Sequence, residues 1–171
     1  MINLELVLPE IFLSLSIMFL LIFGVFKNDS SKIIYNISLI VLLTTAVITF
    51  NETLGIEGAL LFNNSVIIDY LSSFMKIVTL LGGLFVLAIS SNYLKIFKIF
   101  KIEYPILILS SILGMMVMIS SNDLIVFYMG LELQSLALYV LASFNRDQLK
   151  SSEAGLKYFV LSALSSGLLL Y

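Results

Sequence analysis

Six long stretches of mostly apolar residues follow one another along this chain of 171 residues. The hydrocarbon core of a bilayer is about 30 Å thick, and a helix needs about 20 apolar residues to cross it. The chain is 60% hydrophobic and 12% charged, whereas soluble domains carry about 25% charged residues. A soluble fold of this size could not bury so much apolar surface. The sequence therefore predicts an all-α, polytopic transmembrane helical bundle with six helices.

The six predicted helices differ in length and in how clearly they are bounded. The fourth is short and opens at Pro105, a residue that suits the first turn of a helix. A polar turn at 120–123 then leads into the fifth. The chain stops inside the sixth apolar stretch, so we expect it to be a fragment of a longer polytopic protein. The ranges are 7–26, 33–50, 71–92, 104–121, 124–144 and 155–171.

Basic residues lie in alternate connections between these helices. The N-terminal end and the connections at 51–70 and 120–123 carry none. Cytoplasmic loops of membrane proteins are enriched in Lys and Arg, so we predict that the N-terminus lies outside and that the three basic connections lie inside. The basic residues in these connections are Lys27, Lys32, Lys95, Lys98, Lys101, Arg146 and Lys150.

The connection at 51–70 is the only long one. Apolar residues at 59–62 and 66–68 flank Asn63, Asn64 and Ser65, a pattern that fits a short β-hairpin on the outer surface. An irregular loop is the alternative interpretation. We divide the chain into a three-helix membrane segment at 1–103, which includes this outer loop, and a second unit at 104–171 with helices four to six.

Two residue types with characteristic chemistry are missing. The chain has no cysteine and no histidine, which excludes disulfides and thiolate metal sites and removes the usual near-neutral proton carrier. The common ligand sets for haem, zinc and iron–sulfur clusters are also unavailable, so we predict no cofactor and no redox centre in this chain. The sequence has no run of basic residues of the kind that would indicate nucleic-acid binding. If protons move here, Glu, Asp, Lys, Tyr and water must carry them.

Glu132 is the only charged residue in the apolar stretch 124–144. A charge at the bilayer centre costs about 2.5–3.5 kcal/mol on insertion scales, and such residues are functional by default. Helical spacing places Tyr128, Ser135 and Tyr139 on the same face. The functional interpretation is a protonatable acid beside a hydrated path, with these three as possible relay groups. The alternative is a protonated Glu that only bonds a neighbouring helix.

Other charged residues near the helix ends allow two interpretations. Lys157 lies near the start of the sixth helix, and Glu153 precedes it by four residues, the favourable order for an ion pair. Lys157 can therefore serve the same proton path, with Glu153 as a further relay group, or be a surface lysine held by Glu153. Lys76 is long enough to reach the membrane surface, and we expect Glu10 to be solvated or at the level of the lipid headgroups.

Small residues lie together in three places, two of them at helical spacing. Ser110 and Gly114 form one such pair, Ala163 and Gly167 form another, and Gly82 and Gly83 are adjacent. Small residues let membrane helices approach closely. We therefore expect helix packing at these positions.

Two runs of residues resemble a known family. The run YMGLELQSLALYVL at 128–141 resembles the fifth helix of the antiporter-like subunits of respiratory complex I. The run SSEAGLKYF at 151–159 is similar to the start of the sixth helix in one of them, subunit N of the proton-translocating NADH:quinone oxidoreductase, called subunit 2 in mitochondria. LPE at 8–10 and SNDL at 121–124 fit the same subunit.

This resemblance implies a larger fold with two inverted repeats, each containing a broken helix. Residues 104–171 would be the truncated start of the first repeat. The resemblance assigns Glu132 to the proton channel, paired with a lysine on a later helix beyond Tyr171, and places Lys157 near the same channel. It also implies membrane and peripheral complex I subunits as partners, with NAD, FMN, iron–sulfur clusters and quinone bound to them. We expect a bacterial plasma membrane, with the mitochondrial inner membrane as the alternative.

The predicted function is that of a membrane-arm subunit that couples electron transfer from NADH to quinone, on other subunits, to proton translocation. One alternative is a subunit of a multi-chain cation/proton antiporter or of a membrane-bound hydrogenase. Another is a non-transporting membrane scaffold whose Glu and Lys side chains only bond helices together.

Overall fold

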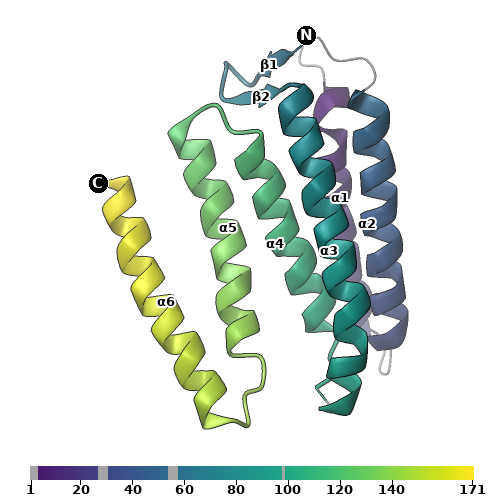
Figure 1. The fold of residues 1–171 in the computed structure, drawn as a ribbon, viewed down its shortest axis with the longest axis vertical. Helices are drawn as coiled ribbons and strands as arrows, with labels where there is room; N and C mark the ends of the chain where they lie inside the picture. Colours follow the sequence, from purple (N-terminus) through teal and green to yellow (C-terminus); the bar gives the residue numbers. More distant parts are fainter. Residues whose placement is uncertain (1–3, 27–30, 54–57, 98) are drawn as a thin grey trace.

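The computed structural model describes residues 4–26, 31–53, 58–97 and 99–171, without the side chains of 4, 5 and 53. Six α-helices run alternately up and down in these ranges (Figure 1), which confirms the predicted all-α class and helix number. Lys27 and Lys98, predicted to lie in basic connections, are outside the described residues. The elements are η1 (Leu4–Val7), α1 (Leu8–Phe26), α2 (Ser31–Thr53), β1 (Ala59–Leu61), β2 (Val66–Ile68), α3 (Tyr70–Ile96), α4 (Glu103–Ile119), α5 (Leu124–Ala142) and α6 (Leu149–Leu170).

Four of the described helices are long and apolar enough to cross a membrane: α1, the Ser31–Glu52 part of α2, α3 and α5. The helix α4 is apolar but has 17 residues, in line with the short fourth stretch of the sequence. The first turns of α6 contain Lys150, Glu153 and Lys157, which lower its apolar character. Crossing of the membrane by α4 and α6 remains a prediction.

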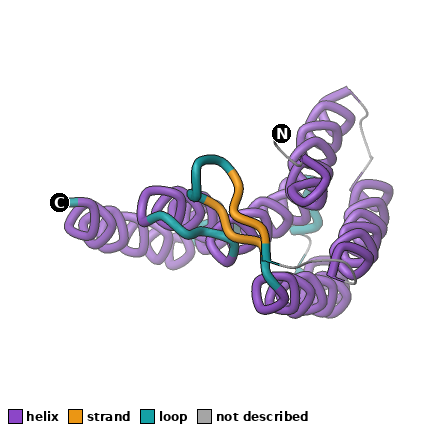
Figure 2. Tube along the Cα trace, turned by 90° about the horizontal axis from the view of Figure 1, so that it is seen from above, coloured by secondary structure: helices purple, strands orange, loops and turns teal. Residues whose placement is uncertain are grey.

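The first four helices share one hydrophobic core. Its fully buried side chains include Leu13 of α1, Leu42 of α2, Leu80 of α3 and Leu109 of α4. The helix α5 packs on α4, and α6 packs on the far side of α5. Seen from the hairpin end, α5 and α6 extend away from the cluster formed by the other helices (Figure 2). The core therefore lies among α1, α2, α3 and α4, and α5 packs on it mainly through α4.

Glycines set the closest approaches between helices. A Cβ atom added at Gly114 would lie 2.6 Å from the backbone nitrogen of Gln134 and 2.8 Å from the carbonyl oxygen of Gly130. A Cβ atom at Gly83 would lie 2.2 Å from the side chain of Ile112. Gly82, by contrast, has nothing within 4 Å of such an atom. The expected packing role holds for Gly114 and Gly83.

The long connection forms the predicted β-hairpin. β1 and β2 pair antiparallel, with Leu61 opposite Val66. Phe62, Asn63 and Asn64 adopt positive φ values in the turn between them, a conformation that asparagine tolerates better than most residues. The alternative of an irregular loop is wrong for 59–68. Phe62, expected in the strand, belongs to the turn.

The hairpin also joins the turn between α4 and α5. The backbone nitrogen of Ile67 donates to the carbonyl oxygen of Ser120 at 2.8 Å, and that of Asn122 donates to Ser65 at 2.9 Å. The side-chain amide of Asn122 adds a bond to the Asn64 carbonyl at 2.7 Å. These bonds attach the hairpin, which connects α2 to α3, to the turn that precedes α5.

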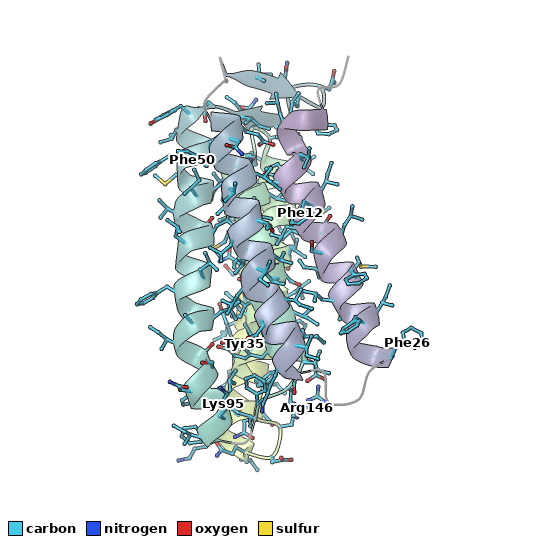
Figure 3. The ribbon with its side chains drawn as sticks, turned by 90° about the vertical axis from the view of Figure 1, so that its right-hand side faces the viewer. Phe12, Phe26, Tyr35, Phe50, Lys95 and Arg146 are labelled. Atoms are coloured by element: carbon cyan, nitrogen blue, oxygen red, sulfur yellow. The ribbon has the colours of Figure 1, made fainter. Side chains whose placement is uncertain are left out.

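The two ends of the bundle differ in charge as the sequence predicts. The hairpin and the α4–α5 turn lie at one end, and the last residues of α1, α3 and α5 lie at the other (Figure 1). Lys95 and Arg146 both lie at this second end, opposite Phe50 (Figure 3). We call the two ends the hairpin end and the basic end. The assignment of the basic end to the cytoplasm remains a prediction.

The glycine contact between α4 and α5 gives a first prediction. Gly114→Ala should destabilise the complete protein by about 1–3 kcal/mol, because its methyl group would overlap backbone atoms that cannot rotate away. The measurement is the unfolding temperature in detergent. Gly82→Ala is the matched control and should leave that temperature unchanged or slightly raised, because its methyl group meets open space. Equal effects of the two variants would contradict this account of the contact.

Candidate functional site

The start of α5 is fixed by local bonds. Asp123 has an extended backbone, and its carboxylate accepts a hydrogen bond from the backbone nitrogen of Ile125 at 3.3 Å. A carboxylate at this position also suits the positive end of the helix dipole. Together with the hairpin bonds, this cap sets where α5 begins and therefore which of its residues face each neighbour.

The two faces of α5 have different chemistry. Gly130 and Ala137 are buried, and Gly130 lies directly against the α4 backbone. Residues 128, 132, 135 and 139 lie on the other side of the helix, because a helix turns about 100° per residue. Ser135 and Tyr139 are buried there, while Tyr128 and Glu132 are half-buried. The predicted polar stripe therefore exists as one continuous face directed away from α4.

This polar face meets α6. The Tyr139 hydroxyl donates to the Ser162 hydroxyl, and the Tyr139 ring packs edge-on against Tyr158, with centroids 4.9 Å apart. Ser166 is buried one turn further along α6. We call the polar residues on these facing sides of α5 and α6 the α5–α6 seam: Tyr128, Glu132, Ser135, Tyr139, Ser162 and Ser166.

Glu132 lies in the middle of α5, about 12 Å from its first residue and about 15 Å from its last at 1.5 Å per residue. Its carboxylate makes no hydrogen bond and no ion pair with any residue that the structure describes. The Ser135 hydroxyl donates to the backbone carbonyl of Glu132 at 3.1 Å, so it does not bond the carboxylate in this arrangement. The Glu132 carboxylate is therefore free to take up a proton or to accept a hydrogen bond from a donor group.

Lys157 and Glu153 form their own ion pair at the basic end. The Lys157 nitrogen lies 2.5 Å from Glu153 Oε1, and the two side chains are 68% and 51% exposed. Gly155, two residues before Lys157, is buried against Ser143 at the end of α5. Two residues correspond to about 200° of helix rotation, so Lys157 faces away from α5. The described structure does not bring Lys157 and Glu132 together.

An ion pair at the hairpin end was not predicted from the sequence. Lys76 Nζ lies 2.5 Å from Glu10 Oε1, with side chains 3% and 10% exposed. The expectation of a solvated Glu10 and a Lys76 that reaches the surface is wrong, because both side chains are buried inside the bundle of the first four helices. The sequence signal was available: both residues lie within the first two turns of helices that start at the same end, and their charges are opposite.

A cavity of about 700 Å³ lies near the basic end, among α1, α4, α5 and α6. Tyr139 and Gly155 line it, and so do the charged residues Glu103 and Arg146. It therefore places the Tyr139 end of the seam beside polar groups at the basic end. Among the described residues, no group of three or more acidic side chains is arranged to hold a metal ion.

Comparisons with known proteins show which family contains helices like α5 and α6. Residues 121–171, which span the polar turn, α5 and α6, match the family described as NADH:quinone oxidoreductase/Mrp antiporter, TM. Over 169 residues the chain is 72% identical to NADH-quinone oxidoreductase subunit N of Pelagibacter ubique. The predicted resemblance to subunit N is confirmed. Subunit N of Bartonella bacilliformis is 51% identical over 169 residues, and that of Maricaulis maris is 48% identical over 170 residues.

These similarities extend along nearly the whole chain but not along the whole relatives. Each of the three alignments covers 99% of this chain but only 34% to 36% of the subunit N relative. The chain therefore spans about a third of the length of the relatives it matches. All candidate site residues at 128–157 fall inside the family match, whereas Glu10 and Lys76 fall outside it.

The bond between Tyr139 and Ser162 gives a prediction for the seam. Tyr139→Phe and Ser162→Ala should each lower stability, and the double variant should show a coupling of about 0.6 kcal/mol, with about 1.7 kcal/mol as the upper range for hydrogen bonds between membrane helices. A double-mutant cycle on the unfolding of the complete protein measures it. Ser165→Ala, at an exposed position on α6, is the control and should not couple to Tyr139→Phe. Additive effects of the first pair would contradict the bond.

Proposed function

We propose that this chain is part of a membrane-arm subunit of a proton-translocating NADH:quinone oxidoreductase. In this proposal Glu132 is the acid that takes up and releases the proton. The observation that carries it is the position of Glu132: mid-helix, on a polar seam, and without a bonded partner among the described residues. The names of the subunit N relatives and the antiporter family match over α5 and α6 support it.

The chemistry of the site follows from electrostatics in a medium of low dielectric. A buried carboxylate is stable when a cation lies nearby, and it takes a proton when that cation moves away. A change in the distance between Glu132 and a lysine elsewhere in the complete protein can therefore load and release a proton. The side chains of Tyr128, Ser135 and Tyr139, with bound water, are the relay candidates along the seam.

Lys157 and Glu153 have a different part in this proposal. Their pair lies in the first turns of α6 at the basic end, with both side chains exposed and Lys157 turned away from α5. Lys157 can exchange a proton with water there, and its separation from Glu153 would alter the charge felt along the seam. We propose that the pair tunes or supplies protonation at the basic end and does not contact Glu132 directly.

The electron-transfer chemistry belongs to other subunits in this proposal. NAD, FMN, iron–sulfur clusters and quinone would be bound by partner subunits, and this chain would hold no redox centre. The location would be the bacterial plasma membrane, as a multi-pass subunit. A cation/proton antiporter subunit is the second candidate, because the family description names both kinds of protein. A scaffold without transport is the third.

Glu132→Gln in the complete protein within its complex tests the role directly. The substitution keeps the shape and most hydrogen-bonding capacity but removes the titrating group. We expect proton pumping to fall at least tenfold, while the amount of assembled complex stays within twofold of the parent protein. The measurement is proton uptake into membrane vesicles, driven by NADH oxidation and normalised to assembled complex.

Asp147→Asn, in the exposed connection before α6, is the matched control and should pump normally. A scaffold would tolerate Glu132→Gln, so normal pumping by that variant would reject the proposed role. An antiporter subunit would show a loss of sodium/proton exchange without dependence on NADH or quinone. The two transport candidates are therefore separated by the same variant in two assays.

The ion pair at the basic end gives a further prediction. Lys157→Met should slow pumping severalfold and shift its pH profile, because the cation near the basic end is lost. Glu153→Gln should shift the profile in the opposite direction, because it leaves Lys157 charged and unpaired. Pumping rates across a series of pH values measure both. Identical profiles for the parent and the two variants would assign the pair to the protein surface alone.

A further inference from the structure

The buried pair of Glu10 and Lys76 lies outside the α5–α6 seam and is not used by the function proposed above. Its two charged atoms are 2.5 Å apart, and both side chains are at least nine-tenths buried. Removing each ion from water costs several kcal/mol even after relaxation. The attraction between them offsets part of this cost, so the pair is stable only while its total charge stays near zero.

A second carboxylate lies close to this pair. Glu52, in the last turn of α2, is half-buried and lies within electrostatic reach of both Glu10 and Lys76. The other described carboxylates at the hairpin end have different surroundings. Asp69 accepts a hydrogen bond from the backbone nitrogen of Ser72 at 2.7 Å, and Asp123 is exposed at the start of α5. The cluster therefore combines two acids with one base.

The charge of this cluster depends on how many protons it holds. With both carboxylates and the ammonium ionised, its net charge is −1. An uncompensated charge in a poorly solvated site is costly, and two acids that share one cation titrate as a coupled unit. One added proton, bound to a carboxylate oxygen, makes the cluster neutral.

The geometry shows where such a proton can bind. Glu10 Oε1 is paired with Lys76, whereas Glu10 Oε2 is buried and has no hydrogen-bond partner among the described residues. A buried acceptor without a donor loses the bonds that it would make to water. A proton shared between Glu10 Oε2 and a carboxyl oxygen of Glu52 would supply the hydrogen bond that Oε2 lacks.

We propose that Glu10, Glu52 and Lys76 form a proton-binding site at the hairpin end of α1, α2 and α3. The site holds one proton on its two carboxyl groups while Lys76 stays charged. Binding forms one O–H bond and involves no electron transfer. The site is separate from Glu132, and it does not depend on proton translocation along the α5–α6 seam.

Infrared spectroscopy of the complete protein in its complex can measure how many carboxyl groups of this site are protonated. A protonated carboxyl group has a C=O stretch that a carboxylate lacks, so difference spectra between variants at neutral pH report the number of protonated acids. Relative to the parent protein, Glu52→Gln and Glu10→Gln should each lose one protonated carboxyl. Lys76→Met should gain one, because both acids must then be neutral.

Two further variants keep the test decisive if a single substitution disturbs folding. Glu52→Gln leaves the pair of Glu10 and Lys76 intact, and the double variant Glu10→Gln/Lys76→Met removes both of its charges. The double variant should show the same number of protonated carboxyls as the parent, because Glu52 alone would be protonated. Glu103→Gln, at the basic end, is the matched control and should leave the signal at the parent level.

A purely structural ion pair predicts a different pattern. In that case Glu52→Gln would leave the infrared signal unchanged, and this result would overturn the proposal. Loss of the band on addition of NaCl at constant pH would also overturn it, because a sodium ion would then be the bound species. Failure of the Glu132 proposal would appear in the pumping assay and would leave these infrared counts unaltered.

Discussion

The contact between α4 and α5 depends on the lack of side chains at Gly114 and Gly130. Because backbone meets backbone there, α5 is held at a fixed distance and rotation relative to α4. That rotation directs residues 128, 132, 135 and 139 to the opposite side, where α6 packs. The polar seam is therefore a consequence of helix packing as much as of polar residues, since a larger residue at either glycine would displace the whole face.

Charges within the apolar part of the chain occur in two separate arrangements. At the hairpin end, Glu10 of α1 and Lys76 of α3 neutralise each other at 2.5 Å. In the seam, Glu132 shares its face of α5 with the hydroxyl-bearing Tyr128, Ser135 and Tyr139, and no cation is bonded to it among the described residues. The first arrangement already contains a cation in contact with its acid. The second requires a partner that moves or a proton, and this is why we place the transport chemistry there.

Much of the architecture could be predicted from apolar runs and turn residues. The six helices, the hairpin around Asn63 and Asn64 and the charged basic end all follow from local patterns that need no knowledge of the tertiary fold. The stripe through Glu132 could be predicted for the same reason, because helical spacing fixes which residues share a face.

The burial of Glu10 and Lys76 could not be derived in this way, although their opposite charges near the start of α1 and α3 allowed a pair. Each residue by itself fits a position near the membrane surface, and only the packing of α1 against its neighbours shows that both are enclosed. Likewise, helical spacing alone did not show that Gly83 contacts a neighbouring helix while Gly82 faces open space. Long-range packing decides such cases, and it depends on how side chains from several helices fit together.

The attachment of the hairpin to the α4–α5 turn is made mainly by main-chain atoms, through Ile67 with Ser120 and Asn122 with Ser65. Main-chain bonds do not depend on which side chains are present, so this join can tolerate wide sequence drift between species. It cannot tolerate a change in length, because inserting or deleting one residue in β2 would shift the register of the strand and reverse its two faces. Related proteins should therefore differ in the amino acids of this loop but keep the same number of residues in it.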